Sequence, residues 1–308
     1  MEATPNAPRC PSCGSARTIF NGRIPDAVQF AGRSLDRPLE GGYLWRCQTC
    51  TLKFRHPRLE KEALDRLYAA GGDQVWQTPT AARTEWCLAR EYLTRELKSG
   101  RILDLGCFDG RFLVSLGPRW SPHGIELIPA AAMRASEAGI KLLGRDFAAL
   151  DETPERFDVV TAFDVIEHVA NPAQFLAASA RVLRPGGLMI IATGNANSLP
   201  WRLLDARNLY CICPEHLVFI NPDWCAANAA RAGLEFREAI RYRRGIFSWR
   251  QRVLDLGKSV VFRAAPGLFA FLRRRGVGKL VHPAAATYPP LWPSARDHML
   301  AVFEKAAQ

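Results

Sequence analysis

The stretch ILDLGCFDGRFLVSL, residues 102–116, runs from a strand-like apolar segment through a glycine turn into a helical pattern. A strand, a glycine turn and a helix N-terminus also form the phosphate cradle of dinucleotide-binding proteins. Here the glycines follow a G-x-x-x-G spacing, and Phe108 stands where a middle glycine would let a pyrophosphate approach. Asp104, at the end of the strand, would repel a phosphate and attract an ammonium group. The turn therefore suits a nucleoside that carries an amino acid better than a dinucleotide.

Strand and helix patterns alternate from this stretch onward, and two further helices are expected before it, at residues 58–72 and 80–100. The expected strands are 101–106, 121–127, 141–146, 157–164 and 186–193. Helical patterns lie between them, which predicts an α/β fold with a doubly wound, mostly parallel sheet. A chain of 308 residues with 48% hydrophobic content can form one large domain with a small appendage.

The N-terminal sequence MEATPNAPRC has no basic start followed by an apolar run, and no segment reaches about 18 uninterrupted apolar residues. We therefore predict a cytoplasmic protein. Its nine cysteines are an odd number in a long chain, so reduced or metal-bound thiols are expected rather than disulfides.

Four of the cysteines form two C-x-x-C knuckles, Cys10 with Cys13 and Cys47 with Cys50. Two such knuckles can present four thiolates to one tetrahedral zinc ion. The interval between them is longer than the usual spacing of about 15–20 residues, but it contains turn formers and a strand-like segment, as a β-hairpin ribbon would. A structural zinc ribbon is the prediction. The alternatives are unrelated thiols or a redox pair, although neither knuckle begins a helix in a βαβ unit.

An ordered set of motifs resembles the class I S-adenosylmethionine-dependent methyltransferases, in the group of ubiquinone-pathway O-methyltransferases and zinc-ribbon sugar methyltransferases. The residues that carry the resemblance are DLGCFDG (104–110), HGIE ending at Glu126, RDF (145–147), FDVVTAFDVIEHV (157–169), LRPGGLMIIAT (183–193) and EHLVFINP (215–222). Phe108 departs from the commoner glycine of the first motif.

The resemblance implies a seven-stranded, mostly parallel Rossmann-like methyltransferase sheet with a small N-terminal zinc ribbon. We predict a zinc ribbon at residues 1–58 and an S-adenosylmethionine-binding core at 59–245. A basic helical insertion or substrate lid is expected at 246–290, followed by the final core strand at 291–308.

By the same resemblance, S-adenosylmethionine is the cofactor. Its expected contacts are Asp104, Gly106, Cys107, Gly110, Glu126, Leu127, Asp146, Phe147 and Asp164. Glu126 would accept hydrogen bonds from both ribose hydroxyls, while Asp104 would steer the amino group of the methionine part. Asp146 and Phe147 would form the adenine site, with the alternative that Phe147 is an ordinary core residue.

The expected catalytic residues are His168, Glu167 and His216, near the end of the strand that finishes at Asp164. Methyl transfer from a sulfonium is an in-line displacement, so the enzyme aligns the acceptor and removes its proton. A neutral histidine suits that task, because its ordinary pKa lies near 6.5. His168 is the stronger candidate, and a structural role is the alternative for both histidines.

A metal hypothesis competes at the same residues. Asp164, Glu167 and His168 resemble the E-x-x-E-H arrangement of small-RNA 2′-O-methyltransferases, in which a divalent ion such as Mg²⁺ polarises the acceptor hydroxyl. Nucleic-acid amino-methyltransferases carry a proline-containing turn at this point, which FDVIEH lacks.

The formal net charge is +11, and residues 241–282 hold eleven Lys and Arg against one acid, Asp255. Such localised charge indicates an anionic partner. An apolar stripe of helical spacing runs beside it, formed by Trp249, Val253, Leu256 and Val260. We expect a helical hairpin that rests on anionic lipid. A solvated basic face, or a soluble lid whose stripe packs on the protein, is the alternative.

Together these features predict O-methylation of a small-molecule, glycan or lipid-linked intermediate by a cytoplasmic enzyme, peripheral at the inner face of the membrane. Carbon or nitrogen acceptors rank lower. The rival from another class is a zinc-ribbon nucleic-acid-binding protein, or an RNA methyltransferase that uses the basic segment. The acceptor and the oligomeric state stay open.

Overall fold

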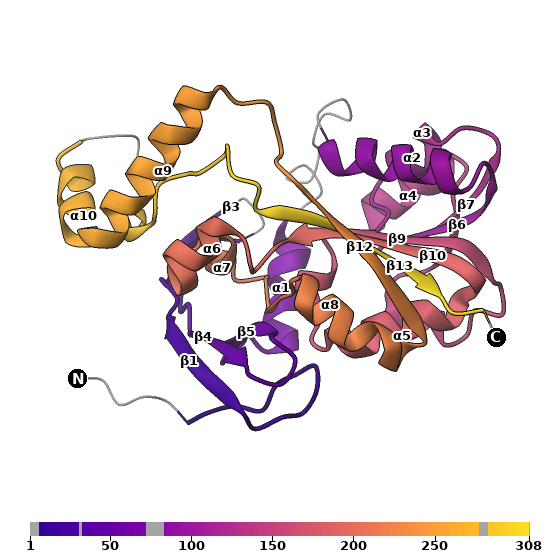
Figure 1. Cartoon of the computed structure of the whole chain (residues 1–308), viewed down its shortest axis with the longest axis horizontal. Coiled ribbons are helices and arrows are strands. Elements are labelled where there is room, and N and C mark those ends of the chain that lie inside the picture. Colours follow the sequence, from indigo (N-terminus) through magenta and orange to yellow (C-terminus); the bar gives the residue numbers. More distant parts are fainter. Residues whose placement is uncertain (1–5, 31–32, 72–82, 277–282, 308) are drawn as a thin grey trace.

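The main element of the computed structural model is a seven-stranded sheet in the order β12-β13-β10-β9-β6-β7-β8 (Figure 1). The structure describes residues 6–30, 33–71, 83–276 and 283–307. The strands are β6 (Gly100–Leu105), β7 (Trp120–Ile125), β8 (Lys141–Gly144), β9 (Phe157–Phe163), β10 (Leu183–Gly194), β12 (Leu234–Tyr242) and β13 (His298–Lys305). Neighbours from β8 to β10 are parallel, and β13 is antiparallel to both β10 and β12. The predicted mostly parallel, seven-stranded methyltransferase sheet is confirmed.

Helices cover both faces of this sheet. α2 (Thr84–Glu96), α3 (Arg111–Ser115) and α4 (Pro129–Glu137) lie on one face, and α5 (Pro172–Val182) and α8 (Pro222–Ala229) on the other (Figure 1). β9 shows why: all seven of its residues are buried. Val160 packs in one hydrophobic cluster with α5, while Val159 packs in the other with α2 and α3. A strand buried on both faces is nearly continuous in apolar residues, and in β9 five of the seven residues are apolar.

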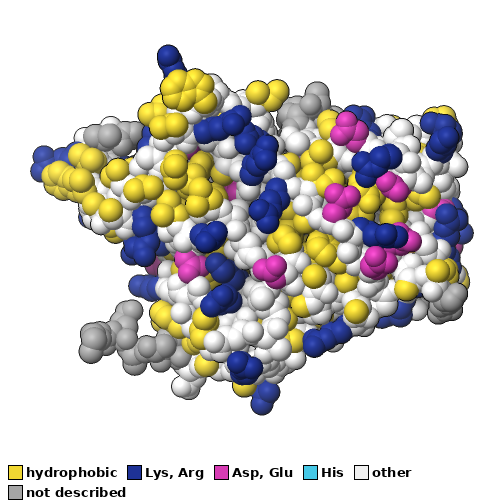
Figure 2. Space-filling view, in the orientation of Figure 1, with side chains coloured by type: hydrophobic (Ala, Val, Ile, Leu, Met, Phe, Trp, Pro, Cys, Tyr) yellow, Lys and Arg dark blue, Asp and Glu magenta, His cyan; other side chains and the backbone are white. Residues whose placement is uncertain are grey.

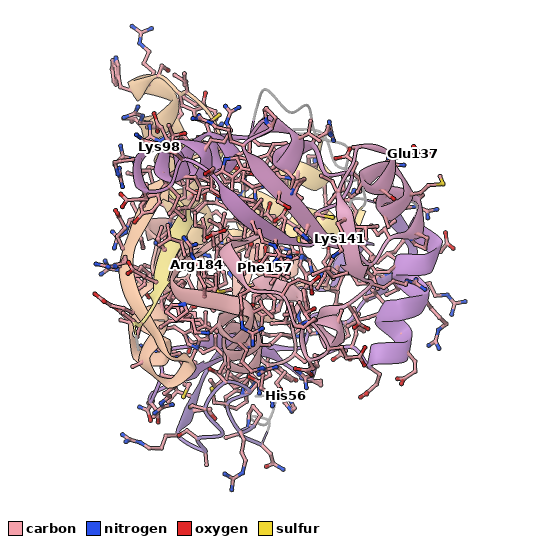
Figure 3. All side chains as sticks on the ribbon, turned by 90° about the vertical axis from the view of Figure 1, so that its right-hand side faces the viewer. His56, Lys98, Glu137, Lys141, Phe157 and Arg184 are labelled. Carbon is pink, nitrogen blue, oxygen red and sulfur yellow. The ribbon has the colours of Figure 1, made fainter. Side chains whose placement is uncertain are left out.

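The strand order reverses between β6 and β9, which run side by side although two further strands lie between them in the chain. In open α/β sheets, ligands bind beyond the carboxyl ends of the strands at such a switch point. Figure 3 looks toward the other end of these strands, with Phe157 and Arg184 labelled where β9 and β10 begin. The glycine turn after β6 and the segment after β9 therefore meet at the carboxyl-terminal edge of the sheet, beyond the ends of these two strands.

The N-terminal segment forms small antiparallel sheets, as the ribbon prediction requires. Its strands are β1 (Thr18–Arg23), β2 (Ala27–Phe30), β3 (Arg33–Leu39), β4 (Tyr43–Cys47) and β5 (Lys53–His56). The larger sheet has the order β1-β4-β5-β11, and its fourth strand, β11 (Val218–Phe219), comes from far along the chain. The ribbon sheet thus extends across the boundary expected at residue 58.

Three further helices lie in the region around the ribbon (Figure 1). They are α1 (Lys61–Gly71), α6 (Leu199–Leu204) and α7 (Leu209–Ile212). α1 and α2 occupy the two stretches in which helices were expected before the first core strand.

The basic segment between β12 and β13 contains α9 (Trp249–Ala264) and α10 (Pro266–Arg274), which form an arm on the left of Figure 1. The apolar spacing predicted these helices. Buried Asp255 anchors the arm, because its carboxylate accepts a hydrogen bond of 2.6 Å from the Ser294 hydroxyl. Within the described residues, no helix is long and apolar enough to span a bilayer.

Candidate active site

A cavity of about 450 Å³ lies at the sheet edge identified above. This volume is within the usual range for small-molecule sites. Its walls include six of the predicted residues: Asp104, Gly106, Cys107, Glu126, Asp164 and His168. The glycine turn, the end of β7 and the segment after β9 supply them, so the motifs that lie apart in the sequence converge here.

The glycine turn is held in an unusual conformation. Phe108 has φ 49°, in the left-handed region that favours glycine, and its N–H donates to Glu126 Oε2 at 2.8 Å. Gly106 also has a positive φ, and a Cβ there would lie 2.7 Å from Val165. At Gly110 a Cβ would lie 2.6 Å from Ile140, so packing of α3 against its neighbours requires that glycine.

Glu126 is buried at the end of β7, with both carboxylate oxygens engaged. Oε2 accepts from Phe108 and Oε1 from the N–H of Ile128, each at 2.8 Å. Burial raises the pKa of this carboxyl above its usual value, against the effect of the backbone donors. Each carboxylate oxygen has a second lone pair, so Glu126 can still accept from a ligand hydroxyl.

Asp104 lies at the end of β6 and is 3% exposed. Its Oδ1 accepts a hydrogen bond of 2.7 Å from Thr161. Burial raises the pKa of Asp104 to about 7. A carboxyl in this state favours a cationic partner, since a nearby ammonium would stabilise its charged form.

Four predicted cofactor residues lie outside the cavity lining: Gly110, Leu127, Asp146 and Phe147. Asp146 caps the short helix 147–150, accepting from the Ala148 N–H at 2.9 Å. Phe147 packs edge-on against Phe175 of α5, with 4.9 Å between ring centroids. The core role considered for Phe147 therefore matches this contact, and Leu127 is 46% exposed.

Asp164 follows β9 in a left-handed conformation, φ 54°, and lines the cavity between two arginines. Its carboxylate pairs with Arg83 at 2.8 Å and with Arg244 at 2.7 Å. Burial opposes the charged form, but Arg244 and Arg83 hold the pKa of Asp164 below its usual value. The carboxylate expected to serve a cofactor or a metal is thus engaged by arginines.

His168 and His216 lie together beside Glu167, with 4.9 Å between the two ring centroids. The Nδ1 atom of His168 is 3.1 Å from the Glu215 carbonyl, and that of His216 is 2.8 Å from the Tyr210 carbonyl. A carbonyl only accepts, so each Nδ1 carries the proton and each Nε2 is left as an acceptor. Burial lowers the pKa of both histidines, which keeps them neutral near pH 7.

Glu167 is buried behind the cavity wall. Its carboxylate accepts from the Thr193 hydroxyl at 2.9 Å and from the Tyr210 hydroxyl. Burial and the nearby Asp164 raise the pKa of Glu167 to about 7. Ligand atoms of Glu167, His168 and His216 lie within 4.8 Å of one another, so this trio can approach one cation, whereas Asp164 points to its arginines.

Several residues of this region were not found from the sequence. Tyr68, from α1, places its hydroxyl 3.2 Å from His168 Nδ1, while Arg83 and Arg244 bind Asp164. Tyr210 joins Glu167 to Thr193. None belongs to a motif. The one available signal was the position of Arg244 at the start of the basic segment.

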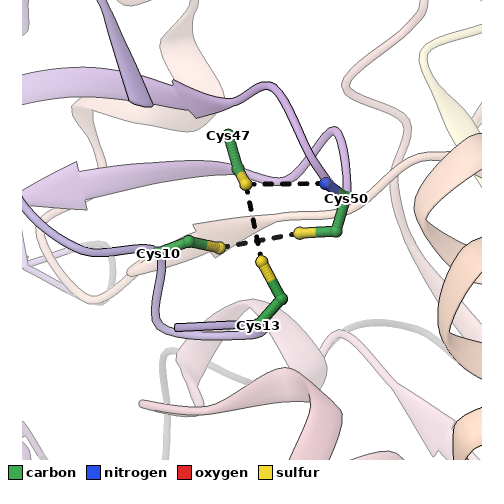
Figure 4. Close-up of side chains that lie close together, drawn as sticks. All are labelled: Cys10, Cys13, Cys47 and Cys50. Atoms are coloured by element: carbon green, nitrogen blue, oxygen red, sulfur yellow. Dashed lines mark hydrogen bonds between the residues drawn. The ribbon is translucent and has the colours of Figure 1, made fainter. Parts of the chain in front are cut away.

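The four predicted zinc ligands converge on one point (Figure 4). Sγ of Cys10 lies 3.6 Å from that of Cys50, and Sγ of Cys13 lies 3.6 Å from that of Cys47. Four thiolates on a tetrahedral zinc, at about 2.3 Å each, would be separated by about 3.8 Å. The cluster is consistent with a zinc ribbon.

Comparison with known proteins agrees with this geometry. Residues 80–239 match the family described as a methyltransferase domain. A ubiquinone biosynthesis O-methyltransferase of Aeromonas salmonicida is 33% identical over 45% of this chain and 64% of its own length. The enzyme of that name from Cereibacter sphaeroides is 32% identical over 52% of this chain and 71% of its own. The solved N-methyltransferase NodS of Bradyrhizobium japonicum, in complex with S-adenosyl-L-homocysteine, aligns with 79% of this chain and 97% of its own, at 16% identity and TM-score 0.45.

The chain therefore belongs to the class I S-adenosylmethionine-dependent methyltransferases. It carries, in addition, the N-terminal four-cysteine cluster. The chain spans just under two thirds of the length of the Aeromonas relative, so that protein's activity is not transferred to it here.

The raised pKa of Asp104 leads to a pH prediction. We predict that the Asp104 carboxylate accepts the ammonium group of the ligand, so its protonation as pH falls through about 7 should weaken that contact. The affinity for S-adenosylhomocysteine should then fall by up to about tenfold per pH unit below that value. Calorimetric titration on both sides of pH 7 measures it. Asp104→Asn should bind weakly with little pH dependence, and a variant that keeps the wild-type slope would contradict the assignment.

Proposed function

We propose that the protein transfers the methyl group of S-adenosylmethionine to an oxygen of a small-molecule acceptor, with His168 as the base. The observation that carries this proposal is the tautomer of His168. The Glu215 carbonyl fixes the proton on Nδ1, so Nε2 can take the acceptor's proton. His168 also lines the cavity, whereas His216 and Glu167 lie behind it and support the ring.

The cofactor would occupy the cavity with its methionine part at the glycine turn. Asp104 would bind the ammonium group, and Glu126 would accept from the ribose hydroxyls through its remaining lone pairs. The cofactor supplies the electrophilic methyl group. The protein aligns the acceptor oxygen with that group and provides a place for its proton.

A divalent cation is the second candidate for activating the acceptor. Glu167, His168 and His216 offer one carboxylate and two imidazoles whose ligand atoms lie within 4.8 Å of one another, a better match than the predicted set with Asp164. The two mechanisms differ in their metal dependence. Turnover that survives chelation and does not rise with Mg²⁺ or Mn²⁺ supports the histidine base.

His168→Gln should lower turnover by about 100-fold, because general-base catalysis contributes on that order. The affinity for S-adenosylhomocysteine should stay within about twofold, since the base touches the acceptor and not the cofactor. Single-turnover transfer of labelled methyl groups and calorimetry measure the two quantities. Equal losses in both would show that His168 is structural. His123→Gln, on β7 and outside the cavity lining, is the matched control.

We also propose that the four-cysteine cluster holds a structural zinc ion. The sulfur separations and the two backbone N–H groups directed at Cys47 Sγ support this. The four cysteines would bind the metal as thiolates. The zinc ion would stabilise the ribbon and take no part in the reaction.

Purified protein should contain about one zinc per chain. The double variant Cys10→Ser/Cys47→Ser should lose the metal and unfold at a lower temperature, because one ligand is removed from each knuckle. Elemental analysis and thermal unfolding test this. The control is Cys87→Ser, an exposed cysteine of α2 that is not one of the four predicted ligands. Zinc-free wild-type protein would refute the ribbon.

For the arm, we propose contact with an anionic membrane that presents a lipid-linked acceptor. The stripe residues Trp249, Val253, Leu256 and Val260 are 69%, 60%, 39% and 47% exposed, so the stripe does not pack on the protein. Figure 2 shows hydrophobic side chains gathered over this arm with basic ones beside them. Exposed Arg274 and Arg275 lie at the end of α10. Arg273 instead donates to the carbonyl of Tyr288 at 2.6 Å.

Sedimentation with anionic liposomes at low salt should capture the protein. The variant Trp249→Ser/Arg274→Gln/Arg275→Gln should stay in the supernatant, because each basic residue near such a surface contributes about 1 kcal/mol. Arg90→Gln/Arg119→Gln, two exposed arginines near α2 and α3, is the charge-matched control and should still bind. If the wild type stays in the supernatant, the proposed membrane contact is wrong. Salt-dependent RNA binding without methyl transfer would instead favour the alternative of a nucleic-acid-binding protein.

A further inference from the structure

Arg55 of β5 is a buried arginine of the ribbon that reaches into the methyltransferase core. Its side chain is 3% exposed. The described partners of its guanidinium are four backbone carbonyls: Gly41, Cys211, Cys213 at 2.9 Å and His216 at 3.2 Å. Three of these belong to the segment 211–216. One planar group with five donors thus ties that segment to the ribbon.

Backbone hydrogen bonds continue the same connection. The Arg55 N–H donates to the Leu217 carbonyl at 2.9 Å, and the Leu217 N–H donates to the Glu167 carbonyl at 2.7 Å. Val218 and Phe219 then pair with Phe54 and Lys53. Two consecutive hydrogen bonds through Leu217 therefore lead from β5 to the turn that carries Glu167.

The segment held by Arg55, together with Tyr210 directly before it, orients both histidines. The Glu215 carbonyl binds His168 Nδ1, and the Tyr210 carbonyl binds His216 Nδ1. These two contacts set the tautomers on which the base depends. A shift of this backbone would move the rings or release their protons to the other nitrogen.

The cysteine cluster holds the other end of this arrangement. β4 ends at Cys47, whose N–H donates to the Leu52 carbonyl at 2.8 Å, just before β5 begins. Asn221, the cap of α8, donates to the Thr51 carbonyl at 3.2 Å. β5 is thus fixed at its start by the cluster and along its length by β4 and β11.

We infer that the zinc ribbon is a positioning element of the methyltransferase site, and that Arg55 is the residue through which it acts. The ribbon places Arg55, and Arg55 places segment 211–216. Glu215 of that segment then holds the imidazole of His168, and the adjacent Tyr210 holds that of His216. This inference rests on the proposed function for the role of the histidines. It assigns the ribbon a task in the reaction besides folding.

The test compares Arg55→Lys and Arg55→Met with wild type in the full-length protein. Lysine keeps a charge and three donors but loses the planar fork, and methionine removes every donor. Arg46→Met is the matched control, since Arg46 is exposed on the adjacent strand β4. Four quantities are measured in each protein: the zinc content, the Kd for S-adenosylhomocysteine, the rate of single-turnover methyl transfer and the NMR resonances of the histidine rings.

Both Arg55 variants should keep their zinc and bind S-adenosylhomocysteine within about twofold of wild type. Methyl transfer should fall by about 10–100-fold for methionine and less for lysine, the scale expected when catalytic groups are displaced by about 1 Å. The ring resonances of His168 and His216 should shift, and that of His123 should not. Arg46→Met should match wild type in every measurement.

Unchanged resonances of His168 and His216 in a folded Arg55 variant would overturn the inference, as would normal turnover beside an active wild type. If Arg55→Met does not fold, Arg55→Lys decides the outcome by the same readouts. A wild type that transfers no methyl group to any acceptor refutes the proposed function. The histidine resonances still decide whether Arg55 positions these rings.

Discussion

The hydrogen bond between the Phe108 N–H and Glu126 holds the ligand-binding edge of this protein together. Phe108 adopts a left-handed conformation that costs a bulky residue on the order of 1–3 kcal/mol. Such a conformation persists only where its surroundings impose it. The buried Glu126 carboxylate imposes this conformation from the neighbouring strand, because it accepts the hydrogen bond of the Phe108 N–H. The carboxylate that suits a ribose also shapes the turn that faces the amino acid.

Much of this edge follows from short-range sequence patterns. The run FDVVTAF is mostly apolar because β9 is buried on both faces, and the glycine turn after β6 begins a helix as its spacing predicts. Glu126 could be identified by its place at the end of the second strand. The four cysteines were found by their spacing alone. In each case the physical requirement falls within a few consecutive residues, so the sequence displays it directly.

The remaining contacts join residues that are far apart in the chain. Arg55 meets segment 211–216 only because β11 completes the ribbon sheet, and a two-residue strand leaves almost no pattern to detect. Arg83 and Arg244 pair with Asp164 although each lies about 80 residues from it in the chain. No motif marks them. The adenine prediction for Phe147 rested on a resemblance, whereas its contact with Phe175 is decided by packing of α5 that no local pattern reveals.

The charges at this edge favour a cationic cofactor. Asp104, Glu126 and Glu167 are buried carboxyls with raised pKa values, while the arginines Arg83 and Arg244 are committed to Asp164. S-adenosylmethionine brings an ammonium and a sulfonium, and each would stabilise a nearby carboxylate. Methyl transfer would remove the sulfonium charge and leave the ammonium and carboxylate of the amino-acid part. The electrostatic attraction of the cavity for its ligand would then decrease when the product forms, which would favour exchange of S-adenosylhomocysteine for a new cofactor.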